Sequence, residues 1–208
     1  MIDYTAMDPR ELRGCAALAA RAFYDYEYFS LYLPEEARRQ AFLDALLLCE
    51  FRANRAKPEV KFLTAREDGR LLAVAQLCSP AFRKPTNLCY LRCGWLGVLR
   101  WGGSGPVNAW NAMEKLASAP CHGLGGQNWY LSLLTVAREE EGRGIGSRFL
   151  QECLIPYVKK EGAEIFSLFT NSEGNRRFYE KNGFTEFDAQ RFSYGKGSIG
   201  SWSYVMRF

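Results

Sequence analysis

A glycine turn between an apolar strand and an apolar-faced helix is the feature that most constrains this chain. Residues 128–158 contain an apolar run, a polar turn, the segment Glu141-Gly142-Arg143-Gly144-Ile145-Gly146-Ser147, and then a helical pattern. Glycines at the mouth of a helix let backbone N–H groups converge on a ligand, and the free N–H groups of the first turn add the positive end of the helix dipole. The arrangement predicts an anion site, and the expected ligand is a phosphate or pyrophosphate.

Two other glycine-rich phosphate sites do not fit this turn. A P-loop places a Lys before its final Ser or Thr, and no Lys stands between Gly146 and Ser147. The dinucleotide fingerprint needs a third glycine three residues after the second, and that position is Phe149. The residues therefore exclude both interpretations.

A second motif follows a predicted strand over residues 164–170. Asn175 stands four residues before Tyr179 on a short predicted helix, residues 175–181, which stops at Asn182-Gly183 before a strand begins. In this order, the glycine turn and this motif resemble the two signatures of the GNAT superfamily of N-acetyltransferases. The phosphate loop of that family reads Gln or Arg, two residues, Gly, one residue, and Gly or Ala. The branch that looks most similar includes puromycin N-acetyltransferase.

The resemblance implies an α/β (α+β) fold with a mixed, mostly antiparallel central sheet flanked by helices. A V-shaped gap is expected between two central strands, residues 129–136 and 164–170. One domain over residues 1–208 is the simplest expectation for a chain of this length.

The resemblance also implies a cofactor and the residues that hold it. Acetyl-CoA is the expected cosubstrate, with its pantetheine arm on the backbone of Leu134 and Val136 and its pyrophosphate on the amides of the glycine turn. Tyr179 is the expected acid for the leaving thiolate, and Asn175 either bonds the pantetheine amide or caps its helix. The expected cofactor-binding residues are Leu134, Thr135, Val136, Glu141, Gly142, Arg143, Gly144, Ile145, Gly146, Ser147, Asn175 and Tyr179.

Glu141 departs from the family pattern, because a negative side chain stands where Gln or Arg is expected. We expect Glu141 to point away from the anion, with Arg143 and Arg148 partly offsetting its charge. The acidic run over residues 139–141 is interpreted as a solvated turn.

The residues leave the general base open. Glu27 and Asp25 lie in an aromatic and acidic stretch, residues 23–29, and Ser132 on the central strand could order a water. The stretch is either a loop that wraps core rings or a wall of the acceptor site. An amine can also lose its proton to a chain of waters, so no single base is required. The catalytic candidates are therefore Tyr179, Glu27 and Ser132.

The expected function is direct transfer of an acetyl group from acetyl-CoA to a primary amine of a small-molecule acceptor. Two alternatives stay open. One is a CoA-binding sensor or regulatory module without turnover, and the other is an acyltransferase that uses another acyl chain or another acceptor.

Composition argues against several other classes of function. The formal charge is only +4 and the basic residues are scattered, so no nucleic-acid partner is expected. No signal segment and no membrane span are visible, and we expect a cytoplasmic protein; a homodimer is left open. Seven cysteines without clustered metal ligands predict reduced, largely buried thiols and no metal.

Helical periodicity predicts three helices before the glycine turn. Asp8 is the expected N-cap of the first, with Pro9 at its first position and Glu11 closing a capping box. The second begins at residues 34–36, and the third covers residues 107–116.

Turn residues and alternation predict the other elements. Strands are expected over residues 60–65, 71–78, 184–187 and 202–206, the first two joined as a hairpin and the last two separated by a turn over residues 195–201. His122, the only histidine, is placed in a loop over residues 120–126, either exposed or as an acid–base group. Pro156 is expected to kink or end the helix after the glycine turn. Residues 79–106 show no clear period and receive no assignment.

Overall fold

Seven strands form one sheet in the order β1-β2-β3-β4-β5-β7-β6. The structure, a computed structural model, describes residues 1–208. All neighbouring strands are antiparallel except β4 and β5, which run parallel. The strands are β1 (Ile2–Ala6), β2 (Val60–Glu67), β3 (Arg70–Cys78), β4 (Asn128–Val136), β5 (Ile165–Thr170), β6 (Thr185–Tyr194) and β7 (Gly197–Arg207). The prediction of a mixed, mostly antiparallel sheet is confirmed.

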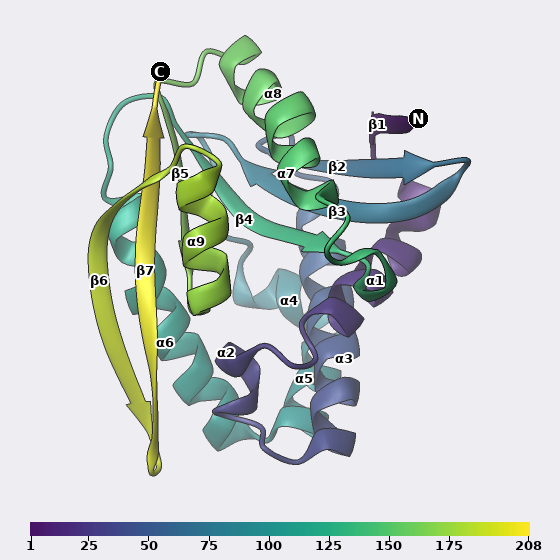
Figure 1. Cartoon of the computed structure of the whole chain (residues 1–208). Helices are drawn as coiled ribbons and strands as arrows, with labels where there is room; N and C mark the ends of the chain where they lie inside the picture. Colours follow the sequence, from purple (N-terminus) through teal and green to yellow (C-terminus); the bar gives the residue numbers. More distant parts are fainter.

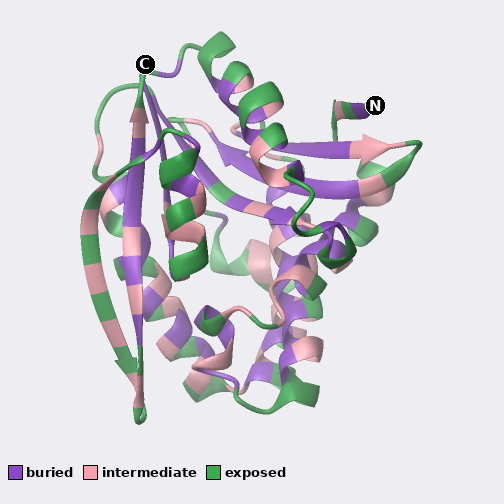
Figure 2. Ribbon diagram, viewed as in Figure 1, coloured by how far each residue is buried: buried purple, intermediate pink, exposed green.

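Helices cover both faces of this sheet (Figure 1). They are α1 (Leu12–Ala22), α2 (Glu27–Ser30), α3 (Glu36–Asn54), α4 (Asn87–Cys93), α5 (Trp95–Gly102), α6 (Ser104–His122), α7 (Ile145–Phe149), α8 (Ile155–Lys160) and α9 (Glu173–Lys181). One hydrophobic cluster, with Phe149 and Tyr179, lies under α7, α8 and α9. The other, with Phe42 and Trp110, lies among α1, α3 and α6. Figure 2 shows that β3 and β4 are largely buried between these layers, whereas β6 alternates between half-buried and exposed residues.

β4 and β5 separate after a short stretch of pairing. Residues 128–130 pair with residues 165–167, and no later residue of β4 pairs with β5. The remaining edge of β4 therefore faces open space instead of a neighbouring strand. The predicted V-shaped gap between these two strands is confirmed.

A β-bulge lies on β4 at the place where the gap opens. Leu131 lies opposite Leu77 and Leu133 lies opposite Gln76, so Ser132 has no partner on β3. A bulge of this kind bends the strand and turns a side chain out of the regular alternation.

The helix after the glycine turn continues through Pro156. Between α7 and α8 lies a π-helical segment, η3 (Leu150–Leu154), in which the Ile155 N–H donates to the Leu150 carbonyl. The regular α-helical pattern of backbone hydrogen bonds is thus already interrupted next to Pro156, which lacks an N–H. The proline coincides with a local distortion of the helix and does not end it.

Two helices and the start of α6 occupy the stretch over residues 79–106 that shows no sequence period. The Thr86 hydroxyl caps α4 by accepting from the Cys89 N–H at 3.3 Å. Gly94, with φ of 115°, ends α4 and allows α5 to start in a new direction.

The predicted loop over residues 120–126 is wrong at its start, because α6 extends to His122. Pro120 removes the N–H that would bond the Leu116 carbonyl four residues earlier. Gln190 of β6 donates to that carbonyl at 3.4 Å instead. A neighbouring strand therefore makes the proline tolerable inside the helix.

The two ends of the chain differ from the predictions. β1 is not predicted from the sequence, yet it pairs with β2 along its whole length. β6 and β7 form one long hairpin that turns at Gly195 and Lys196, so the predicted turn over residues 195–201 is wrong. Cross-strand pairing extends β7 through serines and glycines, and β6 through polar residues such as Asp188 and Gln190, which carry little strand signal of their own.

Several predictions for the first half of the chain are confirmed. Asp8 is the N-cap of a 3₁₀ turn (Pro9–Glu11) that leads into α1, and its Oδ1 accepts from the Arg10 N–H at 2.8 Å. The hairpin of β2 and β3 is present. Glu11 does not close a capping box, because it pairs with Arg66 at 2.5 Å.

All seven cysteines are free thiols, and none is fully exposed. This agrees with the prediction of reduced, largely buried cysteines. None of the helices combines the length and the apolar character that crossing a membrane requires.

Candidate active site

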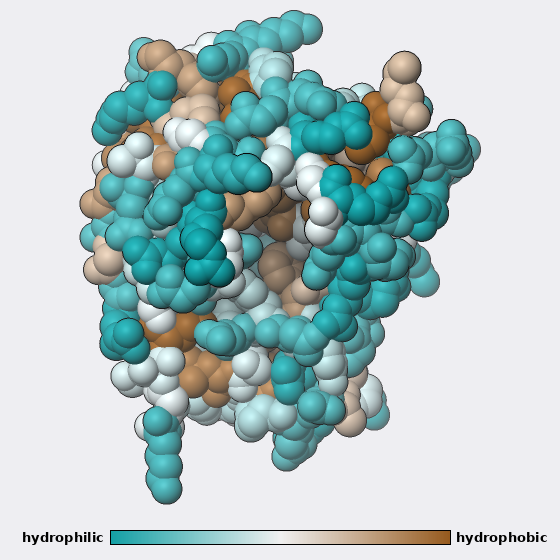
Figure 3. Space-filling model, viewed as in Figure 1, coloured by the Kyte–Doolittle hydropathy of each residue, from teal (hydrophilic) through white to brown (hydrophobic).

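A cavity of about 610 Å³ opens beneath the gap between β4 and β5. Its walls come from β4, α3, α6, α9, the aromatic stretch over residues 23–29 and part of the stretch over residues 82–95. Figure 3 shows an opening with hydrophobic walls near the middle of this face, surrounded by hydrophilic side chains. The place where β4 and β5 part therefore borders this cavity.

The free edge of β4 presents backbone groups to the gap. The Ala137 N–H donates to the Leu72 carbonyl at 2.8 Å, which fixes the side of the strand that faces β3. Backbone groups alternate in direction along a strand. The N–H and C=O groups of Leu134 and Val136 consequently point toward the gap, where no protein strand meets them.

The glycine turn leaves amides free at the start of α7. Gly144, with φ of 72°, is the N-cap, and the first backbone bond of the helix runs from the Arg148 N–H to the Gly144 carbonyl at 3.0 Å. The N–H groups of Ile145, Gly146 and Ser147 are therefore left without a backbone partner. These groups and the helix dipole can hold an anion.

The charges around the turn differ in part from the prediction. Glu141 is exposed and forms no ion pair. Glu140, in contrast, is only 3% exposed and pairs with both Arg70 and Arg143, so the interpretation of residues 139–141 as a solvated turn is wrong at this position. Side-chain direction in the short 3₁₀ turn over residues 138–140 decides which carboxylate is buried.

The two arginines expected to offset Glu141 are engaged elsewhere. Arg143 also pairs with Glu67 of β2 at 3.2 Å, and Arg148 pairs with Glu152 one helical turn later at 3.1 Å. Arg143 therefore ties the glycine turn to the β2–β3 hairpin.

Tyr179 is buried at the edge of the cavity, and its hydroxyl forms no hydrogen bond to a protein group. Burial raises its pKa above the ordinary value for tyrosine, with a smaller contribution from Tyr26. The hydroxyl therefore stays protonated at neutral pH and can donate into the cavity.

Asn175 belongs to a hydrogen-bond network on the same side. Its Nδ2 donates to the Thr170 hydroxyl at 3.2 Å, which lies 2.9 Å from the Tyr26 hydroxyl. The Asn171 N–H donates to that Tyr26 hydroxyl at 2.8 Å. α9 begins at Glu173, so Asn175 lies in its first turn and is not its N-cap. The network fixes the amide next to the cavity.

The candidate bases lie in different surroundings. Ser132 lines the cavity at the bulge, whereas Glu27 is exposed at the start of α2 and does not line it. Asp25 forms an ion pair with Arg138. His122 lies at the end of α6 with its ring 4.6 Å from that of Tyr130, and partial burial lowers its pKa.

The aromatic stretch over residues 23–29 lies both in the core and along the cavity. Tyr28 and Phe29 are buried in the core, with ring centroids 4.9 Å apart. The same two residues, with Phe23 and Tyr26, also line the cavity. The two interpretations are therefore compatible.

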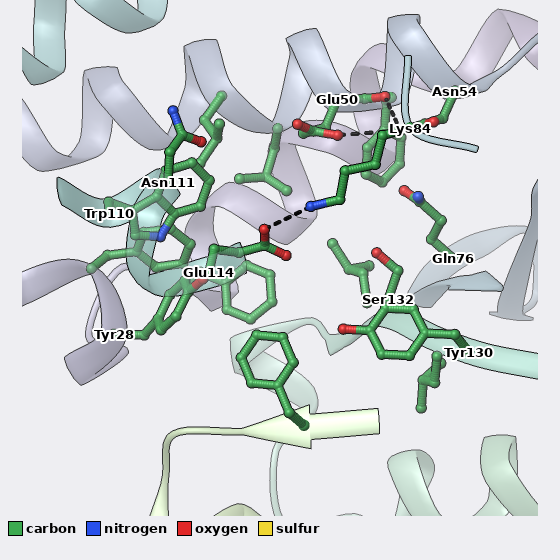
Figure 4. Close-up of a pocket in the computed structure, with 18 of the residues that line it drawn as sticks. Tyr28, Glu50, Asn54, Gln76, Lys84, Trp110, Asn111, Glu114, Tyr130 and Ser132 are labelled. Carbon is green, nitrogen blue, oxygen red and sulfur yellow. Dashed lines mark hydrogen bonds and ion pairs between the residues drawn. The ribbon is translucent and has the colours of Figure 1, made fainter. Parts of the chain in front are cut away.

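The cavity is also lined by charged residues that motif analysis does not select. Glu50 of α3 accepts from the Tyr90 hydroxyl at 3.3 Å and from Asn54 Nδ2 at 3.2 Å. Glu114 of α6 pairs with Lys84 at 3.0 Å (Figure 4). The available sequence signal is a polar residue on an apolar helical stripe, since Glu50 follows Leu46 by four positions and Glu114 follows Trp110 by four.

Ionisation of Glu50 is electrostatically unfavourable in the folded protein. Burial, with the like charge of Glu114 adding to it, raises the pKa of Glu50 to about 7. Lys84 and the hydrogen bonds from Tyr90 and Asn54 act in the opposite direction but do not outweigh burial. At neutral pH the group is therefore poised between its acid and carboxylate forms.

This cost predicts a pH-dependent gain in stability for Glu50→Gln. Because the folded-state pKa is raised, ionisation of Glu50 destabilises the fold increasingly as the pH rises from the ordinary carboxyl range to about 7. The advantage of Glu50→Gln over wild type should therefore grow by about 2 kcal/mol between pH 5 and pH 8 in urea unfolding. Glu36→Gln, at an exposed position of the same helix, is the control. A pH-independent difference would contradict the assigned burial.

A sequence model of the acetyltransferase (GNAT) domain matches residues 109–186, a segment that contains β4, the glycine turn and α9. The comparison with curated proteins finds no match.

Solved structures with the same fold include three acetyltransferases. PaiA N-acetyltransferase from Thermoplasma acidophilum, in complex with coenzyme A, has a TM-score of 0.58 at 15% identity over 100% of this chain and 99% of that one. A protein from Corynebacterium glutamicum described as histone acetyltransferase HPA2 and related acetyltransferase has a TM-score of 0.67 at 16% identity, over 98% and 94%. Polyamine N-acetyltransferase from Drosophila melanogaster has a TM-score of 0.62 at 14% identity, over 100% of both chains.

At these identities the structural similarity establishes the fold. The similarity to the puromycin N-acetyltransferase branch stays a prediction. The segment that matches the acetyltransferase (GNAT) domain, residues 109–186, also contains the place where the sheet splits and the glycine turn at the start of α7.

Proposed function

We propose that the protein transfers the acetyl group of acetyl-CoA directly to a primary amine of a small-molecule acceptor. The observation that carries the proposal is the arrangement of three features along β4. The free edge of β4 and the unpaired hydroxyl of Tyr179 border the cavity, and the unpaired amides at the start of α7 lie beside the end of the same strand.

The residues present fit acetyl-CoA in the gap. The pantetheine arm would lie along β4, where Leu134 and Val136 offer backbone groups of both kinds. The pyrophosphate would lie on the amides of residues 143–147, and Glu141 is exposed and does not close that turn. At Gly144 nothing lies within 4 Å of an added Cβ, so there is room for a ligand at the turn. Asn175 would bond the pantetheine amide from its place beside Thr170.

The chemistry needs a neutral amine, a stabilised oxygen and a proton for sulfur. The amine nitrogen bonds to the acetyl carbon, and backbone N–H groups at the bulged part of β4 stabilise the negative charge that develops on the carbonyl oxygen. The carbon–sulfur bond breaks with its electron pair on sulfur, and the Tyr179 hydroxyl donates a proton to that thiolate. Burial keeps Tyr179 protonated until then, and the same burial raises the basicity of a thiolate beside it.

The proton lost by the amine leaves through the open part of the cavity. Ser132 lines the cavity at the bulge and can hold a water there, whereas the exposed position of Glu27 gives no support to a direct base role. We therefore assign proton removal to water ordered by Ser132.

A cavity with aromatic rings in its wall favours a small molecule over a protein tail. Tyr28, Phe29 and Trp110 line it, and Tyr28 packs edge to face on both other rings. The Drosophila protein is named as a polyamine N-acetyltransferase that forms N-acetylagmatine, and the amines in this name are small molecules. Seven free thiols further favour a reducing compartment, and we propose the cytoplasm.

A thiol-release assay separates this function from a CoA-binding sensor. The protein is incubated with acetyl-CoA and a panel of small amines while free thiol is followed. Amine-dependent thiol release is the expected result. Tight acetyl-CoA binding without release for any amine would favour the sensor, and release only with hydroxyl acceptors or longer acyl-CoA would favour another acyl transfer.

Tyr179→Phe should lower turnover about a hundredfold with little change in acetyl-CoA affinity, since it removes only the proton donor. Turnover is measured by thiol release, and affinity by calorimetry. Tyr157→Phe is the matched control, because Tyr157 packs on Trp129 away from the cavity and its hydroxyl also lacks a protein partner. Equal turnover of the two variants would remove Tyr179 from the acid role.

Gly144→Glu should weaken acetyl-CoA binding about tenfold or more, because it puts a negative side chain beside the expected phosphates. The substitution also strains the backbone at φ of 72°. Gly162→Glu controls for this strain, since Gly162 has φ of 80°, equally free surroundings and a position beyond α8. Similar acetyl-CoA affinity in both variants would overturn the assignment of the turn.

A further inference from the structure

The α3 side of the cavity holds a carboxylate that has no cationic partner. Glu50 accepts hydrogen bonds only from two neutral groups, the Tyr90 hydroxyl and the Asn54 amide, and forms no ion pair. Neutral donors stabilise a buried carboxylate less than a cation does. A positively charged group of a ligand could therefore form an ion pair with Glu50.

Asn54 adds a second unused acceptor next to this carboxylate. Its Nδ2 donates to the Glu50 carbonyl at 3.0 Å and to the Glu50 carboxylate at 3.2 Å, which fixes the orientation of the amide. Its Oδ1 is buried and has no hydrogen-bond partner, although the residue is only 2% exposed. A buried acceptor without a donor costs about 1–3 kcal/mol. A ligand with several N–H groups could satisfy Asn54 and Glu50 together.

The other charges of the cavity do not fill this need. Lys84 forms its ion pair with Glu114 at 3.0 Å, and the Lys84 ammonium approaches that carboxylate in Figure 4. His122 is kept neutral at pH 7 by its lowered pKa. When Glu50 is ionised, two carboxylates against one ammonium leave the cavity with one net negative charge, which a single cation would neutralise.

This carboxylate lies apart from the place where the reaction is expected. Figure 4 shows Glu50 and Asn54 beside α3, with Ser132 and Tyr130 on β4 across the cavity. The attacking amine must reach the thioester at the bulge of β4 and must be neutral when it attacks. A positive charge at Glu50 therefore belongs to a different group of the same acceptor.

We propose that Glu50 and Asn54 form a binding site for a second cationic group of the acceptor, so that the protein selects dibasic amines. This inference rests on the proposed function for its reacting amine. One primary amine lies at β4, and an ammonium or guanidinium group at the other end of the molecule binds Glu50 and Asn54 Oδ1. The apolar chain between the two groups would lie in the cavity, most of whose lining residues are hydrophobic.

The test compares α,ω-diaminoalkanes of increasing length with n-alkylamines of the same length. For wild type and Glu50→Gln, kcat/KM is measured by thiol release with saturating acetyl-CoA. Glu50→Gln should lower the ratio of diamine to monoamine kcat/KM about tenfold to hundredfold, the loss expected for a hydrogen-bonded charge pair. Asn54→Leu should lower the same ratio less. Glu36→Gln, outside the cavity on the same helix, should keep the wild-type ratio.

Equal losses for diamines and monoamines in Glu50→Gln would overturn the proposal, because they would place Glu50 at the reacting amine. An unchanged ratio would overturn it as well. Calorimetric titration of the diamines into the protein saturated with coenzyme A, where no acetyl group is present, measures the cation site without turnover. Wild type should bind the diamine about tenfold more tightly than Glu50→Gln does, and equal binding would again contradict the site. If wild type releases no thiol with any amine, the proposed function fails while this titration still decides the cation site.

Discussion

The separation of β4 from β5 is the constraint on which the site depends. The two strands run parallel for three residue pairs and then part at the bulge of Ser132. A parallel pair that continued would use up the backbone groups of Leu134 and Val136 and close the entrance to the cavity. Because the strands part, those groups stay free of protein partners. The sheet gives up hydrogen bonds at its centre, and the proposed ligand would replace them.

The elements around this gap each contribute one kind of interaction. The glycine turn supplies free amides at the start of α7, and Arg143 with the buried Glu140 fixes that turn to the neighbouring hairpin. α9 supplies Tyr179 from the opposite side. α3 and α6 supply carboxylates that favour a cation. The anionic cofactor would thus bind at the free amides of the glycine turn, and a cationic acceptor would bind near the carboxylates of α3 and α6. This difference in the charge that each region favours is a physical reason for expecting an amine acceptor.

Local patterns were sufficient to predict the centre of the fold and the residues proposed to hold the cofactor. The motif residues have fixed spacings within short segments, namely Gly144 and Gly146 in the glycine turn and Asn175 and Tyr179 on one helix. They can therefore be recognised in the sequence without knowledge of the tertiary structure. The acceptor side could not be predicted in this way, because Glu50 and Glu114 come from helices far apart in sequence and meet only after packing. Their sole local sign was a polar residue on an apolar helical stripe. Glu140 and Glu141 show the same limit, since the direction of neighbouring side chains in a short 3₁₀ turn depends on the arginines that surround them.

A crystal structure with coenzyme A bound tests the central claim most directly, which is that the opened edge of β4 and the glycine turn form one cofactor site. In that structure, pantetheine amide groups should hydrogen-bond to the backbone of Leu134 and Val136. The pyrophosphate should accept from amides of residues 143–147, with the thiol next to Tyr179. Coenzyme A bound elsewhere, or a β4 edge that remains without contacts to the ligand, would contradict this claim.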